Sequence, residues 1–135
     1  MFSNRNISKP RDCGFSLIEV LAAVAIIGII TFLAIPNIIR VQEESEKSLA
    51  ISRAEALNLA MASFVQANGR TLAVGTWAEE STNQDRYLLL APYLAFAPAT
   101  IVSYMPGGFS ATLPDTLLPL QKAELTGPDG EEIAY

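Results

Sequence analysis

Glu19 is the only charged residue between Phe15 and Ile39, a stretch that is otherwise mostly apolar. An ionised carboxylate at the edge of a membrane helix costs about 2.5 kcal/mol or more unless it is paired or reaches the headgroups. One interpretation places Glu19 at the membrane interface, where its charge is solvated. The other gives it a cationic partner, because a membrane carboxylate and a membrane ammonium become tolerable as a pair. The residue types alone leave both interpretations open.

A second group of carboxylates, Asp129, Glu131 and Glu132, crowds one turn near the end of the sequence. Carboxylate oxygens are ligands that Ca²⁺ accepts, so these three are candidate calcium ligands. The sequence around them lacks a ligand-rich loop with regular spacing, and a solvated acidic turn is the favoured interpretation. No metal and no cofactor is therefore expected.

The chain lacks most of the side chains that catalysis uses. It has no histidine, and its single cysteine, Cys13, cannot form an intrachain disulfide. The sequence shows no nucleophile paired with a base, no phosphate-binding loop and no cluster of metal ligands. We therefore do not expect an enzyme. The formal net charge of -5 also disfavours a nucleic-acid partner.

The element that must position Glu19 is a membrane helix. Residues 20–39 carry no charge and would span about 30 Å as a helix, which matches the hydrocarbon thickness of a bilayer. Basic residues before this segment and acidic residues after it place the N-terminus in the cytoplasm and the C-terminal domain outside. The basic residues are Arg5, Lys9 and Arg11, and the acidic ones are Glu43, Glu44 and Glu46.

Residues 14–20 read GFSLIEV, follow a short basic leader and open the apolar helix. This segment resembles the prepilin processing motif of the type IV pilin-like family. The resemblance implies that a prepilin peptidase cuts between Gly14 and Phe15 and methylates the new amine of Phe15. A leader peptide over residues 1–14 would then depart and take Cys13 with it.

The same resemblance implies a partner for Glu19, whose carboxylate would neutralise the Phe15 amine of a neighbouring subunit during assembly. Further expected partners are other copies of the chain, other pilins or pseudopilins, an inner-membrane assembly platform and membrane lipid. The expected location is the inner membrane, crossed once, followed by a periplasmic or extracellular filament.

Two residues are expected to weaken the apolar helix over residues 15–39. Pro36 lacks an amide hydrogen for the carbonyl of Phe32, and Gly28 lowers helix propensity about two turns earlier. A tolerated kink in a membrane helix and a role in assembly are both consistent with this pattern. In filaments of the similar family, the corresponding stretch loses helical hydrogen bonds.

A helical pattern continues over residues 40–69 and forms an amphipathic continuation of the membrane helix. Its apolar residues recur at spacings of three and four, so one face should cover the globular domain. These residues are Ala50, Ala54, Leu57, Met61 and Phe64. Glu43 and Lys47 could form an ion pair at a spacing of four, and Gly69 could end the helix.

Residues 36–39 (PNII) and 68–70 (NGR) resemble the major pseudopilins of type II secretion in residues and spacing. The resemblance ends at Thr71 and Leu72, where that class is expected to have a tyrosine and a proline. It favours a pseudopilin over a pilin.

Residues 70–135 should form a small C-terminal domain. We expect a loop over residues 71–80 with a packed Trp77, then a short helix capped by Ser81. Strands are predicted at residues 101–105 and 109–113 around a Pro-Gly-Gly turn, and at 123–126 and 131–135 around a Gly-Pro-Asp-Gly turn. The predicted fold class is α+β, with a long N-terminal helix packed on a small antiparallel sheet, as the type IV pilin-like fold also implies.

The sequence therefore favours a structural subunit of a type II secretion pseudopilus or a type IV pilus-like filament, assembled through its N-terminal helix. The alternative is a periplasmic binding or enzymatic domain held by a single membrane anchor. For a free-standing anchor Glu19 would be a liability.

Overall fold

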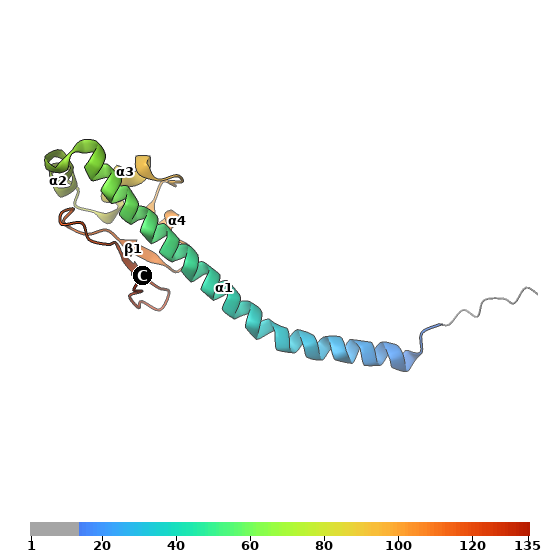
Figure 1. The fold of residues 1–135 in the computed structure, drawn as a ribbon. Helices are drawn as coiled ribbons and strands as arrows, with labels where there is room; N and C mark the ends of the chain where they lie inside the picture. The colour runs from blue at the N-terminus through green and yellow to red at the C-terminus, as the bar shows by residue number, and fades with distance from the viewer. Residues whose placement is uncertain (1–13) are drawn as a thin grey trace, which may run out of the picture. The chain divides into compact units, whose positions relative to one another are not determined.

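The computed structural model describes residues 14–135, so all of the expected leader except Gly14 lies outside the described residues. Helix α1 runs from Leu17 to Asn68 and is the longest element (Figure 1). The chain divides into two compact units between Arg40 and Val41, and α1 contributes to both.

The first unit contains the apolar part of α1, which is long and apolar enough to cross a membrane. Its most apolar window has a mean hydropathy of 2.7, and the protein itself buries none of that window. The large apolar side chains from Phe15 to Ile39 are at least half exposed. Such a surface requires lipid or other subunits to cover it.

The second unit is organised around the predicted apolar face of α1. Ala50, Ala54, Leu57, Met61 and Phe64 are all buried, which confirms the prediction from their spacing. Alanines on this face let the rest of the domain approach the helix closely, while the larger side chains fill the core. The aromatic ring of Phe64 contacts those of Trp77 and Tyr93, with centroid separations of 6.3 and 6.0 Å.

Helix α2 runs from Arg70 to Glu79, so the prediction of a loop over residues 71–80 was wrong. Gly69 separates α2 from α1 at φ 78, a value that favours glycine. The Gly69 carbonyl accepts the first bond of the new helix, from the amide of Ala73 at 3.0 Å. Burial of Ala73 and Trp77, four residues apart, outweighs the low helix propensity of Gly75.

Helix α3, from Asn83 to Leu90, confirms the predicted short helix, although its capping residue is Thr82 and not Ser81. The Thr82 hydroxyl accepts a hydrogen bond from the amide of Asp85 at 3.1 Å. A 3₁₀ turn, η1, then spans Ala91–Tyr93 and accommodates Pro92.

Helix α4 occupies Ile101–Tyr104, where a strand was predicted. Thr100 caps it by accepting from the amide of Ser103 at 3.1 Å, and Gln84 accepts from the amide of Ile101 at 3.0 Å. These bonds and the burial of Ile101 and Tyr104 override the β-propensity of the segment.

The sheet has two antiparallel strands, β1 (Ser110–Thr112) and β2 (Glu124–Thr126), with Ala111 opposite Leu125. Both strands were predicted, but the predicted pairing of residues 101–105 with 109–113 was wrong. The segment 131–135 adds only a single bridge, between Thr126 and Glu132. The predicted turn before it is present, closed by the amide of Gly127 donating to the carbonyl of Glu131 at 2.9 Å. An α+β fold with a long helix and a small antiparallel sheet is thus confirmed.

Candidate assembly and processing site

The peptide bond between Gly14 and Phe15 lies in the non-helical segment just before α1. Both residues are exposed, and 85% of the Phe15 surface is accessible. A Cβ atom added at Gly14 would meet no neighbouring atom within 4 Å. Nothing in the described part of the protein therefore covers this bond against a peptidase.

Glu19 lies in the first turn of α1 and contacts its own chain. The Ser16 carbonyl accepts the first helical bonds, from the amides of Glu19 at 3.0 Å and Val20 at 3.2 Å, so Ser16 is the N-cap residue. The Ser16 amide donates to Oε2 of Glu19 at 3.4 Å. This is one half of a capping box, in which a glutamate three residues into the helix accepts from the amide of the cap residue.

The capping contact directs the Glu19 carboxylate toward the start of α1, one residue away from Phe15. Helix amides and the helix dipole at this end favour a negative charge. The sequence prediction missed this arrangement, although the spacing of Ser16 and Glu19 is the signal of a capping box. The carboxylate is thereby held at the N-terminal end of α1.

Helix α1 continues through Pro36 without a break in its assignment. The Thr31 hydroxyl donates to the Ile27 carbonyl at 2.8 Å, so this polar side chain has a hydrogen-bond partner inside the apolar segment. Gly28 and Pro36 therefore do not end the helix. The expected role of these two residues in assembly stays a prediction.

The acidic turn near the C-terminus lies beside α1. A groove of about 390 Å³ is lined by two of the candidate ligands, Asp129 and Glu131, while Glu132 is not part of its wall. Within residues 14–135, no three acidic or cysteine side chains come together in a way that could hold a metal ion. The structure brings Asp129 and Glu131 to one surface without forming a metal centre there.

Comparisons with known proteins agree with the N-terminal pattern. Residues 9–35 match the family model of the prokaryotic N-terminal methylation motif. The type IV major pilin protein PilA of Myxococcus xanthus is 38% identical over 90 residues, which cover 67% of this chain and 34% of that protein. The N-terminal part of the chain thus resembles type IV pilins and carries their methylation motif.

A second relative is the type II secretion system core protein G of Aeromonas hydrophila. It is 29% identical over 108 residues, or 80% of this chain and 68% of that protein. The chain thus spans about a third of the matched pilin and about two thirds of the secretion protein. No solved structure matches the chain.

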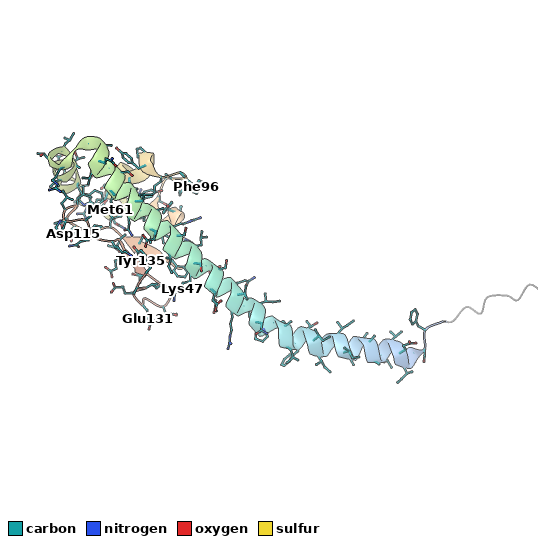
Figure 2. The ribbon with its side chains drawn as sticks, viewed as in Figure 1. Lys47, Met61, Phe96, Asp115, Glu131 and Tyr135 are labelled. Carbon is teal, nitrogen blue, oxygen red and sulfur yellow. The ribbon has the colours of Figure 1, made fainter. Side chains whose placement is uncertain are left out.

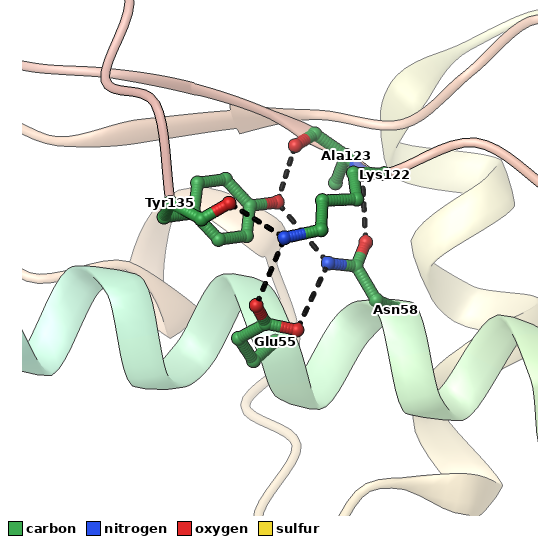
Figure 3. Close-up of polar contacts among 5 residues, drawn as sticks. All are labelled: Glu55, Asn58, Lys122, Ala123 and Tyr135. Atoms are coloured by element: carbon green, nitrogen blue, oxygen red, sulfur yellow. Dashed lines mark hydrogen bonds and ion pairs between the residues drawn. The ribbon is translucent and has the colours of Figure 1, made fainter.

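The C-terminal domain attaches its last residues to α1 through a polar network (Figure 3). Asn58 on α1 accepts from the amide of Ala123 at 2.8 Å and donates to the Tyr135 hydroxyl at 3.2 Å, and that hydroxyl donates to the Ala123 carbonyl. Lys122 pairs with Glu55 at 3.2 Å and donates to the Tyr135 carbonyl. Burial raises the pKa of Tyr135 above its ordinary value of 10.0. The sequence prediction did not identify these residues because the contacts join distant segments.

Proposed function

We propose that the chain is a structural subunit of a pilus-like filament, either a type II secretion pseudopilus or a type IV pilus. The observation that carries this proposal is the combination of the methylation motif with an exposed apolar segment, residues 15–39, whose only charge is Glu19. The relatives are a pilin and a secretion core protein, so an anchored enzyme or binding domain is not favoured.

In the proposed order of events, the chain is first inserted in the inner membrane, with its N-terminus in the cytoplasm and its C-terminal domain outside. Prepilin peptidase removes residues 1–14 and methylates the Phe15 amine. An assembly platform then stacks copies through the polymerisation helix over residues 15–39, while residues 40–69 and 70–135 form the exposed part. The accessible Gly14–Phe15 bond supports the first processing step.

Assembly requires a partner for the new N-terminal ammonium inside an apolar bundle. We propose that Glu19 of the adjoining subunit supplies it, because each charge is unfavourable alone and tolerable as a pair. The bond between Ser16 and Glu19 holds the carboxylate at the correct end of the helix before assembly. Pairing would therefore fix the axial stagger between subunits.

The test compares Glu19→Gln with Glu19→Ala. Glutamine keeps an oxygen that can accept from the Ser16 amide but carries no charge, whereas alanine loses both. Both variants should insert in the membrane at least as well as the unmodified protein, since the cost of the charge is removed. Both should give far fewer filaments, because the Phe15 ammonium has no counter-charge.

Membrane fractionation reports insertion, and the yield of sheared or crosslinked filaments reports assembly. Ser16→Ala serves as a matched control, because it keeps both the backbone amide and the Glu19 charge and should still assemble. A normal filament yield from Glu19→Gln would rule out the pairing role. Filaments that stop at the periplasm or extend from the cell distinguish a pseudopilus from a pilus.

A further inference from the structure

A groove on the second unit combines acidic and apolar side chains. It has a volume of about 390 Å³ and lies between the start of the domain's part of α1 and the turn at residues 127–131. Four exposed carboxylates line it together with one lysine, and the half-buried Phe109 and Ile133 provide apolar surface. The carboxylates are Glu43, Glu46, Asp129 and Glu131, and the lysine is Lys47.

Lys47 does not neutralise this groove. The predicted ion pair between Glu43 and Lys47 is absent from the described residues, where the ion pairs are Arg86 with Asp115 and Lys122 with Glu55. Figure 2 shows Lys47 and Glu131 on neighbouring parts of the domain. The groove therefore keeps an excess of negative charge beside apolar surface.

An arginine side chain has the chemistry to fill such a groove. Its planar guanidinium donates to two carboxylates at once, and its aliphatic stem packs against apolar side chains. A cationic occupant would remove the repulsion among the carboxylates as well as forming hydrogen bonds.

Within residues 41–135, one arginine is left without a partner in its own domain. Arg53 donates to the Tyr104 carbonyl, and Arg86 pairs with Asp115 at 2.8 Å. Arg70 is exposed at the first residue of α2, and its side chain makes no hydrogen bond or ion pair among the described residues. Leu72 beside it is 62% exposed, so this tip presents both a cation and apolar surface.

Arg70 cannot enter the groove of its own chain. With a rise of 1.5 Å per residue, the part of α1 from Glu46 to Asn68 covers about 33 Å, and Arg70 follows beyond that end. A second copy with a parallel α1, displaced by about this length, would bring its Arg70 to the groove. The pairing of Glu19 with a neighbouring Phe15 implies a much smaller step, so the contact would join copies several steps apart.

We propose that, in the filament, Arg70 of one copy inserts into the groove formed by Glu43, Glu46, Asp129 and Glu131 of another copy. The inference rests on the proposed filament function and adds a specific contact between domains. Two observations support this contact. The groove and Arg70 have opposite charges, and Arg53, Arg86 and Lys122 already have partners inside the domain. A single contact of this kind gains strength from repetition along the filament.

Disulfide crosslinking tests the proximity. In the full chain carrying Cys13→Ala, the pair Arg70→Cys and Asp129→Cys should give a ladder of covalent multimers in sheared, oxidised filaments. The matched control replaces Arg70→Cys by Glu79→Cys, at the exposed far end of α2, and should stay monomeric. Filaments that form without a ladder for the first pair, or with equal ladders for both pairs, would overturn the contact.

Charge exchange tests the energetics. Glu46→Arg should lower filament yield on the order of tenfold, and Arg70→Glu should lower it at least as much, because its carboxylate would meet the carboxylates of the groove. Glu44→Arg makes the same change of charge next to the groove but outside its lining, and should assemble normally. Equal losses for Glu44→Arg and Glu46→Arg, or a normal filament yield from Arg70→Glu, would contradict the inference. If the unmodified chain formed no filaments at all, the proposed function itself would fail.

Discussion

Oδ1 of Asn58 accepts a hydrogen bond from the backbone amide of Ala123 at 2.8 Å and so connects α1 to the segment that enters β2. Ala123 is almost fully buried, so water cannot replace this acceptor. The contact joins residues far apart in the chain and fixes the position of the sheet edge on the helix.

Asn58→Ala should therefore destabilise the domain by about 1–3 kcal/mol, because it leaves a buried amide without a partner. Urea unfolding followed by the fluorescence of Trp77, the single tryptophan, measures the change. Glu55→Ala is the matched control one turn earlier on α1. It removes an ion pair between half-exposed side chains and should cost about 1 kcal/mol or less. Equal losses in the free energy of unfolding for the two variants would contradict the prediction that the bond between Asn58 and the Ala123 amide contributes more than the ion pair.

Gly14→Ala should block removal of the leader in cells that contain an active prepilin peptidase. The added Cβ meets nothing within 4 Å, so the substitution should leave insertion and the domain unchanged and act on peptidase recognition alone. Intact mass spectrometry of membrane-purified protein distinguishes a chain that begins at Phe15 from the uncut chain. An unmodified chain that retains residues 1–14 beside an active peptidase would remove the main support for the proposed processing.

The domain should lose stability in alkaline solution. Burial raises the pKa of Tyr87, Tyr104 and Tyr135 above 10.0, so the folded state favours the neutral phenols. This contribution is fully present below pH 10.0 and is lost as the pH rises toward the raised pKa values. The urea midpoint should be steady between about pH 7 and 9 and fall above about pH 10. Tyr135→Phe should make the alkaline fall shallower, and an unchanged slope would exclude Tyr135 as a contributor.

The long helix could be predicted because its signal is local. The apolar face from Ala50 to Phe64 recurs with helical spacing, and Gly69 marks the end of α1. The segment Ile101–Tyr104 misled the prediction, since its isoleucine, valine and tyrosine favour strands. Its helical state depends on Gln84, which lies seventeen residues earlier and bonds the amide of Ile101. Such a distant contact leaves no periodic trace in the sequence.

The processing motif could also be predicted from the sequence, because it lies in one short run of residues around Gly14 and Glu19. The bond between Ser16 and Glu19 could have been predicted from their spacing of three residues, but the sequence analysis did not predict it. The groove could not be predicted from the sequence, since it is formed by Glu43 and Glu46 on α1 and by a turn more than eighty residues later. Of the three candidate calcium ligands, Asp129 and Glu131 line this groove and Glu132 does not, a distinction that their order in the sequence does not reveal.

The continuity of α1 has a mechanical consequence. Because one helix supplies both the membrane segment and the central face of the domain, a force that extracts the subunit passes along hydrogen-bonded backbone and not through a flexible linker. Pro36 should be a point of low stiffness on this path, since the Phe32 carbonyl lacks its helical donor there. Under tension, elongation should therefore start at this point while the domain stays folded, which would let a filament stretch without losing its outer surface.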